Sequence, residues 1–316
     1  MTLTQTLSTL RKSITTVSLS WADSLLLVAV LFWGINISLV KLVLPEMPPL
    51  IFNGLRFMLV CVLMFLLTRL TGHPLRFQRR HWPYLMGLGL LGQTVYQLFF
   101  IFGVAKTTAD NSALILATVP AWVALLDTLL GLERVSGRGW AGIGLSFVGI
   151  VLIIVGGNHE VELAFGGATL WGDALILLAT LCWSLYTVAL RPMLRHYSAI
   201  SVTAISAIIG AIPLILIAAP SLSVFQWGTV SAWGWLGLVF SGTCSITLAY
   251  FFWNYGIARL GSTHTSLYSN LTPLVTLLVA WLWLGETLTL WQVGGGLLAL
   301  VGVALARQHT SPRLVK

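Results

Sequence analysis

Ten apolar stretches of about twenty residues follow one another along the chain, separated by short polar segments. A hydrocarbon core about 30 Å thick needs roughly 20 apolar residues per helical crossing. Each stretch therefore predicts one membrane-spanning helix, and the chain is expected to be an all-α integral membrane protein with ten transmembrane helices. The stretches lie near 24–44, 49–70, 83–105, 108–131, 138–156, 170–191, 199–218, 231–257, 263–284 and 289–306.

Composition and charge agree with this pattern. Of 316 residues, 57% are apolar and 8% are charged, and the mean hydropathy is +0.92, which is typical of a membrane protein. The net charge of +8 does not indicate nucleic acid, because all but three of the seventeen Lys and Arg lie on segments that share a side with the amino terminus. The exceptions are Lys41, Lys106 and Arg56. The positive-inside tendency predicts that both termini are cytoplasmic.

The ends of the chain and its cysteines add little chemistry. Residues 1–20 are expected to be a cytoplasmic segment followed by an uncleaved first span, and 308–316 a cytoplasmic tail. The three cysteines fall inside predicted spans without metal-ligand spacing, so neither a metal nor another cofactor is expected.

The second half of the chain repeats the first. Rare residues recur in order at an offset of 150 and then 153 residues, which predicts five-helix repeats over 21–157 and 170–307. A unit with an odd number of crossings enters the bilayer in opposite orientations in its two copies, so the repeats are expected to be inverted with a cavity between them. Matched pairs include Trp33 with Trp183, Lys41 with Arg191, Pro120 with Pro273, and Glu133 with Glu286.

Those matched residues carry a family resemblance. An aromatic-Trp stretch in the first helix of each unit, a proline inside the fourth, a glutamate at its end and a glycine-rich fifth helix resemble the EamA-type repeats of the drug/metabolite transporter superfamily. The resemblance covers about 21 to 306 and implies a ten-helix exporter of small metabolites in a bacterial inner membrane. The overall pattern is similar to aromatic amino acid exporters of that group.

Two ionisable residues, Arg56 and Asp127, lie inside predicted spans, where charge is costly and marks functional candidates. Arg56 either extends towards the interface or bonds a neighbouring helix, or it binds an anion or gates the pathway. Asp127 is either an interfacial carboxylate satisfied by water or a helix terminus, or it serves a similar function. The two are expected at different depths, which argues against an ion pair between them.

The scarcity of buried charge also restricts the substrate. The first span has no acid between Asp23 and Glu46, so the buried glutamate of small multidrug exporters is missing. No cluster of buried Lys and Arg is present to neutralise a doubly charged phosphate. A neutral or zwitterionic small molecule is therefore favoured, while proton coupling through an unidentified group and simple facilitation stay as alternatives.

Neutral polar and aromatic residues share faces of several predicted helices. Trp33 and Asn36 are three apart, and Tyr250 and Asn254 four apart, which places each pair on one helical face. Amides and hydroxyls in hydrocarbon need partners, so converging faces suggest a substrate cavity; interfacial belts and bonds between helices are the alternatives. The residues assigned to the cavity are Trp33, Asn36, Gln93, Tyr96, Gln97, Trp183, Tyr186, Tyr250, Asn254 and Tyr268.

Two further motifs have simple structural explanations. Pro120 and Pro273 are expected to kink their helices and are candidates for hinges that gate the pathway. Gly87, Gly89 and Gly92 form a G-x-G-x-x-G, but no strand precedes them, so helix packing is favoured over nucleotide binding.

The leading hypothesis is a secondary transporter that exports amino acids, aromatic ones among them, or similar metabolites by alternating access. An exporter of organic cations or drugs, a channel and a membrane-embedded enzyme are the alternatives, and the enzyme is disfavoured because no carboxylate, His or metal cluster is visible. The expected partners are a small-molecule substrate and membrane lipid; the sequence predicts no oligomeric state.

Overall fold

The computed structural model describes residues 20–107, 109–155, 170–275, 278, 289–308 and 310–312. These residues are almost entirely helical, and six helices are long and apolar enough to cross a membrane. An all-α membrane protein is therefore confirmed. The six spans are Trp21–Val43, Pro49–Leu70, Arg79–Lys106, Leu170–His196, Ala199–Val224 and Ala232–Leu260. Shorter apolar helices cover Leu114–Leu129, Gly137–Ile153 and Leu290–Ala306.

The elements follow the predicted apolar stretches. The first half contains α2 (Trp21–Val43), α3 (Pro49–Leu70), η1 (Arg79–His81), α4 (Trp82–Gly89), η2 (Leu90–Val95), α5 (Tyr96–Lys106), α6 (Ala109–Leu116), α7 (Val119–Leu129), β1 (Glu133–Val135) and α8 (Gly137–Val155). The second contains α9 (Leu170–Ala189), α10 (Arg191–His196), α11 (Ala199–Val224), η4 (Trp227–Thr229), α12 (Ala232–Phe240), η5 (Ser241–Leu248), α13 (Ala249–Leu260), α14 (Ser262–Ser266), η6 (Leu267–Leu271), α16 (Leu290–Gln308) and β2 (Thr310–Pro312).

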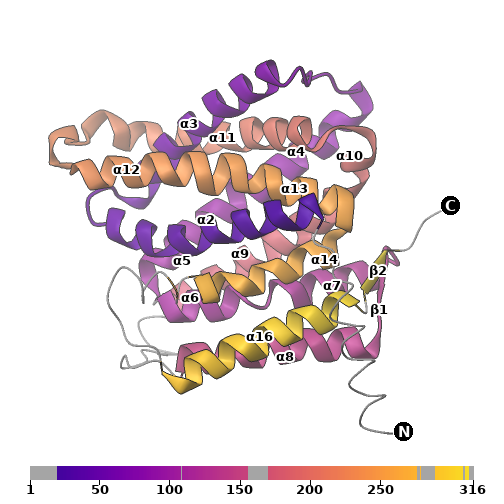
Figure 1. Ribbon diagram of the computed structural model, residues 1–316. Coiled ribbons are helices and arrows are strands. Elements are labelled where there is room, and N and C mark those ends of the chain that lie inside the picture. The colour runs from indigo at the N-terminus through magenta and orange to yellow at the C-terminus, as the bar shows by residue number, and fades with distance from the viewer. Residues whose placement is uncertain are drawn as a thin grey trace, which may run out of the picture.

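Helices of the first half pack mainly against helices of the second. In Figure 1, α3 runs beside α11 at one edge of the bundle and α8 beside α16 at the other. Between these edges, α2 packs on α13 and α5 on α9. The boundary between the halves therefore runs through the centre of the molecule, where polar side chains from both can meet.

The contact between α8 and α16 depends on small residues. A Cβ added at Gly142 would lie 2.5 Å from the backbone nitrogen of Ala306, and one added at Gly302 would lie 2.3 Å from that of Ser146. The two backbones therefore touch, which is the use of small residues expected between membrane helices. The same holds for two glycines of the G-x-G-x-x-G: Gly89 meets Ile209 and Gly92 meets the Tyr186 ring.

The third crossing of each half contains a π-helical segment. The α4–η2–α5 and α12–η5–α13 runs each widen at the middle, over Leu90–Val95 and Ser241–Leu248. Such segments are rare and concentrate at functional sites, because the wider turn shifts side chains and frees carbonyl groups. Both lie midway along their crossings rather than at the ends.

The two candidate hinge prolines lie where helices are interrupted. The helix expected over 108–131 is divided, since α6 ends at Leu116 and α7 begins at Val119, which makes Pro120 the second residue of a helix. At that position its missing N–H removes no intrahelical bond. Pro273 follows the 3₁₀ segment η6. Glu286, its predicted companion at the end of the same helix, lies outside the described residues.

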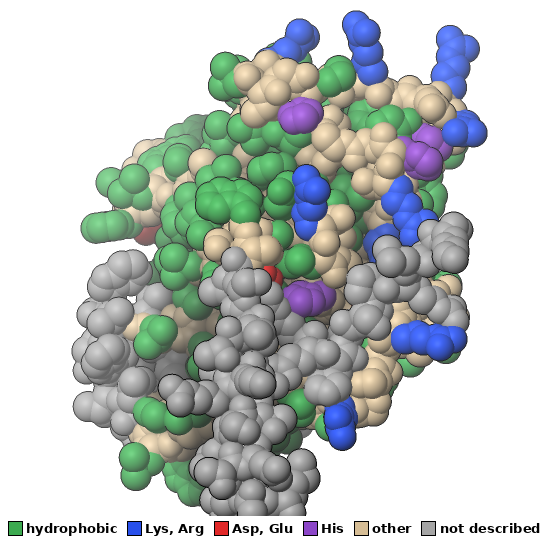
Figure 2. All heavy atoms as spheres, turned by 45° about the vertical axis from the view of Figure 1, so that its right-hand side comes forward, with side chains coloured by type: hydrophobic (Ala, Val, Ile, Leu, Met, Phe, Trp, Pro, Cys, Tyr) green, Lys and Arg blue, Asp and Glu red, His purple; other side chains and the backbone are tan. Residues whose placement is uncertain are grey.

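Surface features agree with a bilayer around the bundle. Trp21, Trp171 and Trp233 lie near the ends of their helices and are 71%, 76% and 80% exposed, as tryptophans of an interfacial belt are. Figure 2 shows Lys and Arg side chains gathered on the face that contains the α10 and β1 end of Figure 1.

Candidate functional site

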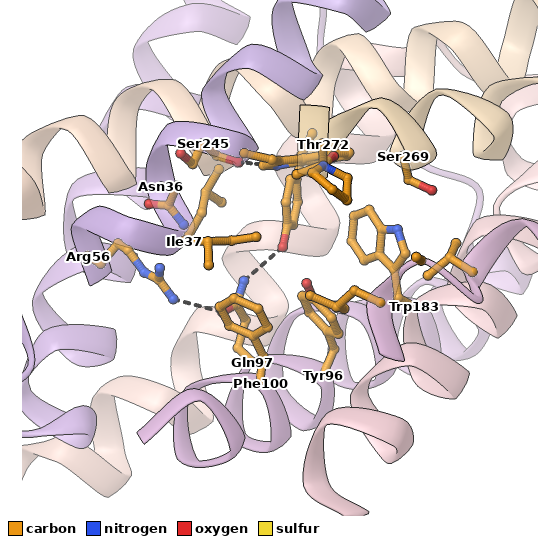
Figure 3. A pocket seen from close by; sticks show the side chains of 17 residues that line it. Asn36, Ile37, Arg56, Tyr96, Gln97, Phe100, Trp183, Ser245, Ser269 and Thr272 are labelled. Atoms are coloured by element: carbon orange, nitrogen blue, oxygen red, sulfur yellow. Dashed lines mark hydrogen bonds between the residues drawn. The ribbon is translucent and has the colours of Figure 1, made fainter. Parts of the chain in front are cut away.

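A pocket lies between the two halves, and Ser245 and Ile246 of η5 are among its lining residues (Figure 3). The open space around its lining side chains, including solvent at its mouth, is about 810 Å³. It is lined by Trp33, Asn36, Ile37, Arg56, Tyr96, Gln97, Phe100, Leu116, Ala117, Val119, Trp183, Ser245, Ile246, Tyr250, Ser269, Thr272 and Pro273. Both halves contribute, and no acidic side chain is among these lining residues.

Aromatic rings form one wall of the pocket. Trp183 is central: its ring centroid lies 5.0 Å from that of Tyr96, 4.9 Å from Tyr250 and 5.8 Å from Trp33. The Trp33 indole N–H donates to the Ser245 carbonyl at 2.9 Å, a carbonyl that belongs to the π-helical segment η5. The wall therefore consists of rigid rings held by each other and by the irregular backbone.

The opposite side of the pocket is polar and centres on Arg56, which is 1% exposed. Its Nη1 donates to Ser241 Oγ at 2.9 Å, and its Nη2 donates to Gln97 Oε1 at 2.7 Å and to Asn53 Oδ1. Gln97 in turn donates to the Tyr250 hydroxyl at 2.8 Å. Among the residues that the structure describes, every hydrogen-bond partner of this guanidinium is neutral, and its buried Nε has none.

Six of the ten residues assigned to the cavity from sequence line this pocket: Trp33, Asn36, Tyr96, Gln97, Trp183 and Tyr250. The other four are buried elsewhere. Gln93 and Asn254 both donate to the Tyr186 hydroxyl at 3.4 Å, forming a polar cluster beside the pocket. Tyr268 donates to Asp23 at 2.5 Å near the start of α2.

A second arginine, Arg191, lies at the α10 end of the boundary between the halves, with 10% of its side chain exposed. Arg191 Nη1 contacts Glu133 Oε1 at 2.7 Å and Asp127 Oδ1 at 3.2 Å. Ser262 and Thr263 donate their hydroxyls to Asp127 Oδ2 at 2.6 and 2.8 Å. We call these five residues the Arg191 cluster. It links α7 and β1 of the first half to the α9–α10 junction and α14 of the second.

Glu133 has a further role in this cluster. Its Oε1 accepts the backbone N–H of Ser262 at 3.0 Å, the first N–H of α14, where a carboxylate is stabilised by the helix terminus. Burial and the neighbouring Asp127 nevertheless raise the pKa of the Glu133 carboxyl, and Arg191 only partly opposes them. Asp127 is paired with Arg191 and not with Arg56, as the expected difference in depth implied.

Several residues of both sites were not identified from sequence. Arg191 had appeared only as the repeat partner of Lys41, and that pairing was the one signal for it. Asn53 and Ser241 bind Arg56, while Ser245, Ser269 and Thr272 line the pocket. Single hydroxyls are common in membrane helices, where they bond their own backbone, so no pattern distinguishes these.

Known proteins confirm the family. The model of the "EamA-like transporter family" matches twice, over residues 20–155 and 170–308. One crystal structure of a protein is similar in fold, with a TM-score of 0.76 at 20% identity over 92% of this chain and 98% of that one.

The relatives are described as transporters. An uncharacterised transporter of Archaeoglobus fulgidus is 31% identical over 90% of this chain and 97% of its own. A probable terminal-alkyne amino-acid exporter of Streptantibioticus cattleyicolor is 27% identical (74% and 76%), and a probable amino-acid metabolite efflux pump of Salmonella typhimurium is 27% identical (88% and 92%). Family and relatives indicate a transporter rather than an enzyme. This chain belongs to the EamA-like transporter family, whose members are multi-pass membrane proteins of the drug/metabolite transporter superfamily.

Proposed function

We propose that this protein exports amino acids, aromatic ones among them, or similar small neutral or zwitterionic metabolites across the bacterial inner membrane. Ten helices in two inverted five-helix repeats, 21–157 and 170–307, would alternate access to one site. Both termini, 1–20 and 308–316, would be cytoplasmic.

Corresponding features of the halves support the inverted repeat. Each third crossing has a π-helical segment, each fourth crossing is interrupted just before a proline, and the fifth crossings α8 and α16 pack on each other. Pairings between the halves are reciprocal as well, since α5 packs on α9 and α13 on α2, third crossing on first in both cases. When each half of an inverted repeat adopts the conformation that the other half had before, the site opens to the opposite side of the membrane.

The observation that carries the proposal is the composition of the pocket, to which Trp33 and Tyr96 come from the first half and Trp183 and Tyr250 from the second. When one half moves relative to the other, the contacts of a ligand held by both halves change, as alternating access requires. Aromatic walls with few amides suit planar or amphipathic substrates. None of the described residues that line the pocket is a carboxylate that could pair with an organic cation, and two relatives are described as amino-acid or amino-acid metabolite exporters.

The Arg191 cluster would close the cytoplasmic end in this conformation, because it ties the halves together on the side assigned to the cytoplasm. Its opening would then be part of each cycle. Proton coupling is the remaining part of the proposal: the raised pKa of Glu133 makes this carboxyl the best candidate to bind a proton when the cluster opens.

Counterflow in proteoliposomes tests the function. Vesicles preloaded with unlabelled L-phenylalanine should take up labelled L-phenylalanine in a saturable, stereoselective manner, and Trp183→Ala should abolish the uptake. Trp233→Ala, an exposed tryptophan, is the matched control and should leave it unchanged. Unselective, non-saturating flux would support a channel instead, and exchange of organic cations alone would overturn the substrate class.

A further inference from the structure

We infer that Arg56 is the carboxylate-binding residue of the pocket, so that the protein selects its substrate by an organic acid group and not by an amine. This rests on the proposed function for the location of the site, and it specifies the substrate class. It makes Arg56 a binding residue rather than a residue that only ties helices together.

The first argument is charge. Arg56 is 1% exposed, and moving an unpaired cation out of water is costly unless an anion accompanies it. No carboxylate contacts it among the residues that the structure describes. It donates to the neutral oxygens of Ser241, Gln97 and Asn53, and its guanidinium carbon lies 4.9 Å from the centroid of the Phe52 ring, which attracts a cation but carries no net charge. The side chain also bonds inward, so it does not extend to the interface. A negatively charged ligand would supply the missing charge.

The second argument is hydrogen bonding. A guanidinium has five N–H donors, and three are used. A buried donor without an acceptor is destabilising, yet Nε of Arg56 has no partner. A purely structural arginine would explain the three bonds, two to neighbouring helices and one to Asn53 of its own helix, but not the donors that remain. Arg56 itself lines the pocket, so a ligand carboxylate there can accept from it.

The third argument concerns the other end of an amino acid. Asn36 lines the same pocket, is 6% exposed and has a buried amide oxygen without a partner among the described residues. It lies on the same side of the pocket as Arg56 (Figure 3). A neutral amide can accept from an ammonium group, but it does not form an ion pair. The carboxylate should therefore contribute more to binding than the amine, with the ring of the substrate against Tyr96 and Trp183.

Three ligands of one shape test this directly. L-Phenylalanine carries both groups, 3-phenylpropionate only the acid, and 2-phenylethylamine only the amine. Their binding to the purified full-length protein is measured by thermal stabilisation as a function of ligand concentration. We expect the two acids to bind, and the amine to bind at least about 10-fold more weakly. Equal or tighter binding of the amine would overturn the inference.

Two variants attribute the selectivity to Arg56. Arg56→Gln should weaken binding of both acids about 10- to 100-fold, the range expected for a charge-assisted hydrogen bond. Gln97→Glu is a second variant in case Arg56→Gln does not fold. It keeps the shape of the Gln97 side chain and places a carboxylate 2.7 Å from Nη2 of Arg56. This internal anion should compete with the ligand and produce the same loss. Arg69→Gln, at the exposed end of the same helix, is the control and should change nothing.

Acid selectivity that survives in both Arg56→Gln and Gln97→Glu would overturn the assignment. The proposed function fails separately: acid-selective binding without any counterflow would sustain the assignment and reject the transporter. Counterflow of phenylalanine with equal binding of the amine would sustain the proposed transport function and reject the assignment of Arg56.

Discussion

Arg56 and Arg191 both lie where the two halves meet, with 1% and 10% of the side chain exposed, but they are surrounded by opposite kinds of partner. Arg191 contacts two carboxylates, Glu133 and Asp127, and is closed off by hydroxyls of α14. Arg56 donates only to amide and hydroxyl oxygens among the described residues, lies over the Phe52 ring at 4.9 Å, and keeps a buried N–H without a partner. One cation is compensated inside the protein and the other is not.

The difference separates two uses of the same side chain. A fully compensated arginine holds elements together, and removing it leaves buried anions unpaired. An uncompensated arginine beside a pocket keeps its electrostatic attraction for a ligand. Charge balance therefore distinguishes an arginine that holds the halves together from a binding residue more clearly than exposure does, since little of either side chain is exposed.

The largest expected effect is on the Arg191 cluster. Arg191→Met should lower the free energy of unfolding by about 3–5 kcal/mol, because Asp127 and Glu133 would remain buried without their cation. Unfolding by SDS titration in mixed micelles measures the change. Arg195→Gln, an exposed arginine one turn further along α10, should stay near the wild type. An equal loss of unfolding free energy in both variants would show that the Arg191 cluster does not hold the two halves together.

A pair of glutamines makes the comparison sharper. Gln97→Glu should be tolerated, because the new carboxylate meets Arg56 and can accept from the Tyr250 hydroxyl. Gln93→Glu, one turn earlier, places the same charge beside Tyr186. Among the described residues, no Lys or Arg is seen in contact with Gln93. We expect Gln93→Glu to be less stable than Gln97→Glu by at least about 2 kcal/mol. The same SDS titration compares them, and equal stability would mean that Arg56 offers no usable charge.

Much of the fold follows from sequence because membrane helices have a strong signal. Every described span coincides with a predicted apolar stretch, since backbone polar groups in hydrocarbon must bond within a helix. The interruption between Leu116 and Val119 and the π-helical turns did not follow. Apolar length is insensitive to a local change of hydrogen-bond register, and a proline indicates a break only to within a few residues.

The site was predictable in kind but only partly in detail. Depth along a helix selected Trp33, Gln97 and Trp183, which do line the pocket. It also selected Asn254, which bonds Thr203 at 2.7 Å instead, because depth does not fix the direction in which a helix faces. Two of the three partners of Arg56, Gln97 and Ser241, are 41 and 185 residues away, a proximity that depends on helix packing and cannot be obtained from local periodicity.

A smaller effect is expected when Arg56 itself is removed. Arg56→Met takes away three hydrogen bonds, but it also takes away a buried cation without a counter-ion, and the two changes oppose each other. The free energy of unfolding should change by no more than about 1 kcal/mol, against several for Arg191→Met. If the two losses were alike in SDS titration, Arg56 would be structural, and the contrast between the two arginines would disappear.

The smallest effect concerns protons at the Arg191 cluster. Glu133 lies in β1, beyond the helical spans, and its pKa in the folded protein is raised above the ordinary 4.5 by burial and by Asp127. A raised carboxyl pKa means that the folded state holds the proton more tightly, so this contribution to stability is complete below the ordinary pKa and is lost as the pH rises through the folded one.

Glu133→Gln, which cannot ionise, should not show that loss. The stability of the variant relative to wild type should therefore increase with pH from about 4.5 towards neutrality, measured as melting temperature in detergent across that range. A difference that stays constant with pH would show that Arg191 fully compensates both carboxylates, and it would remove Glu133 from any account of proton coupling.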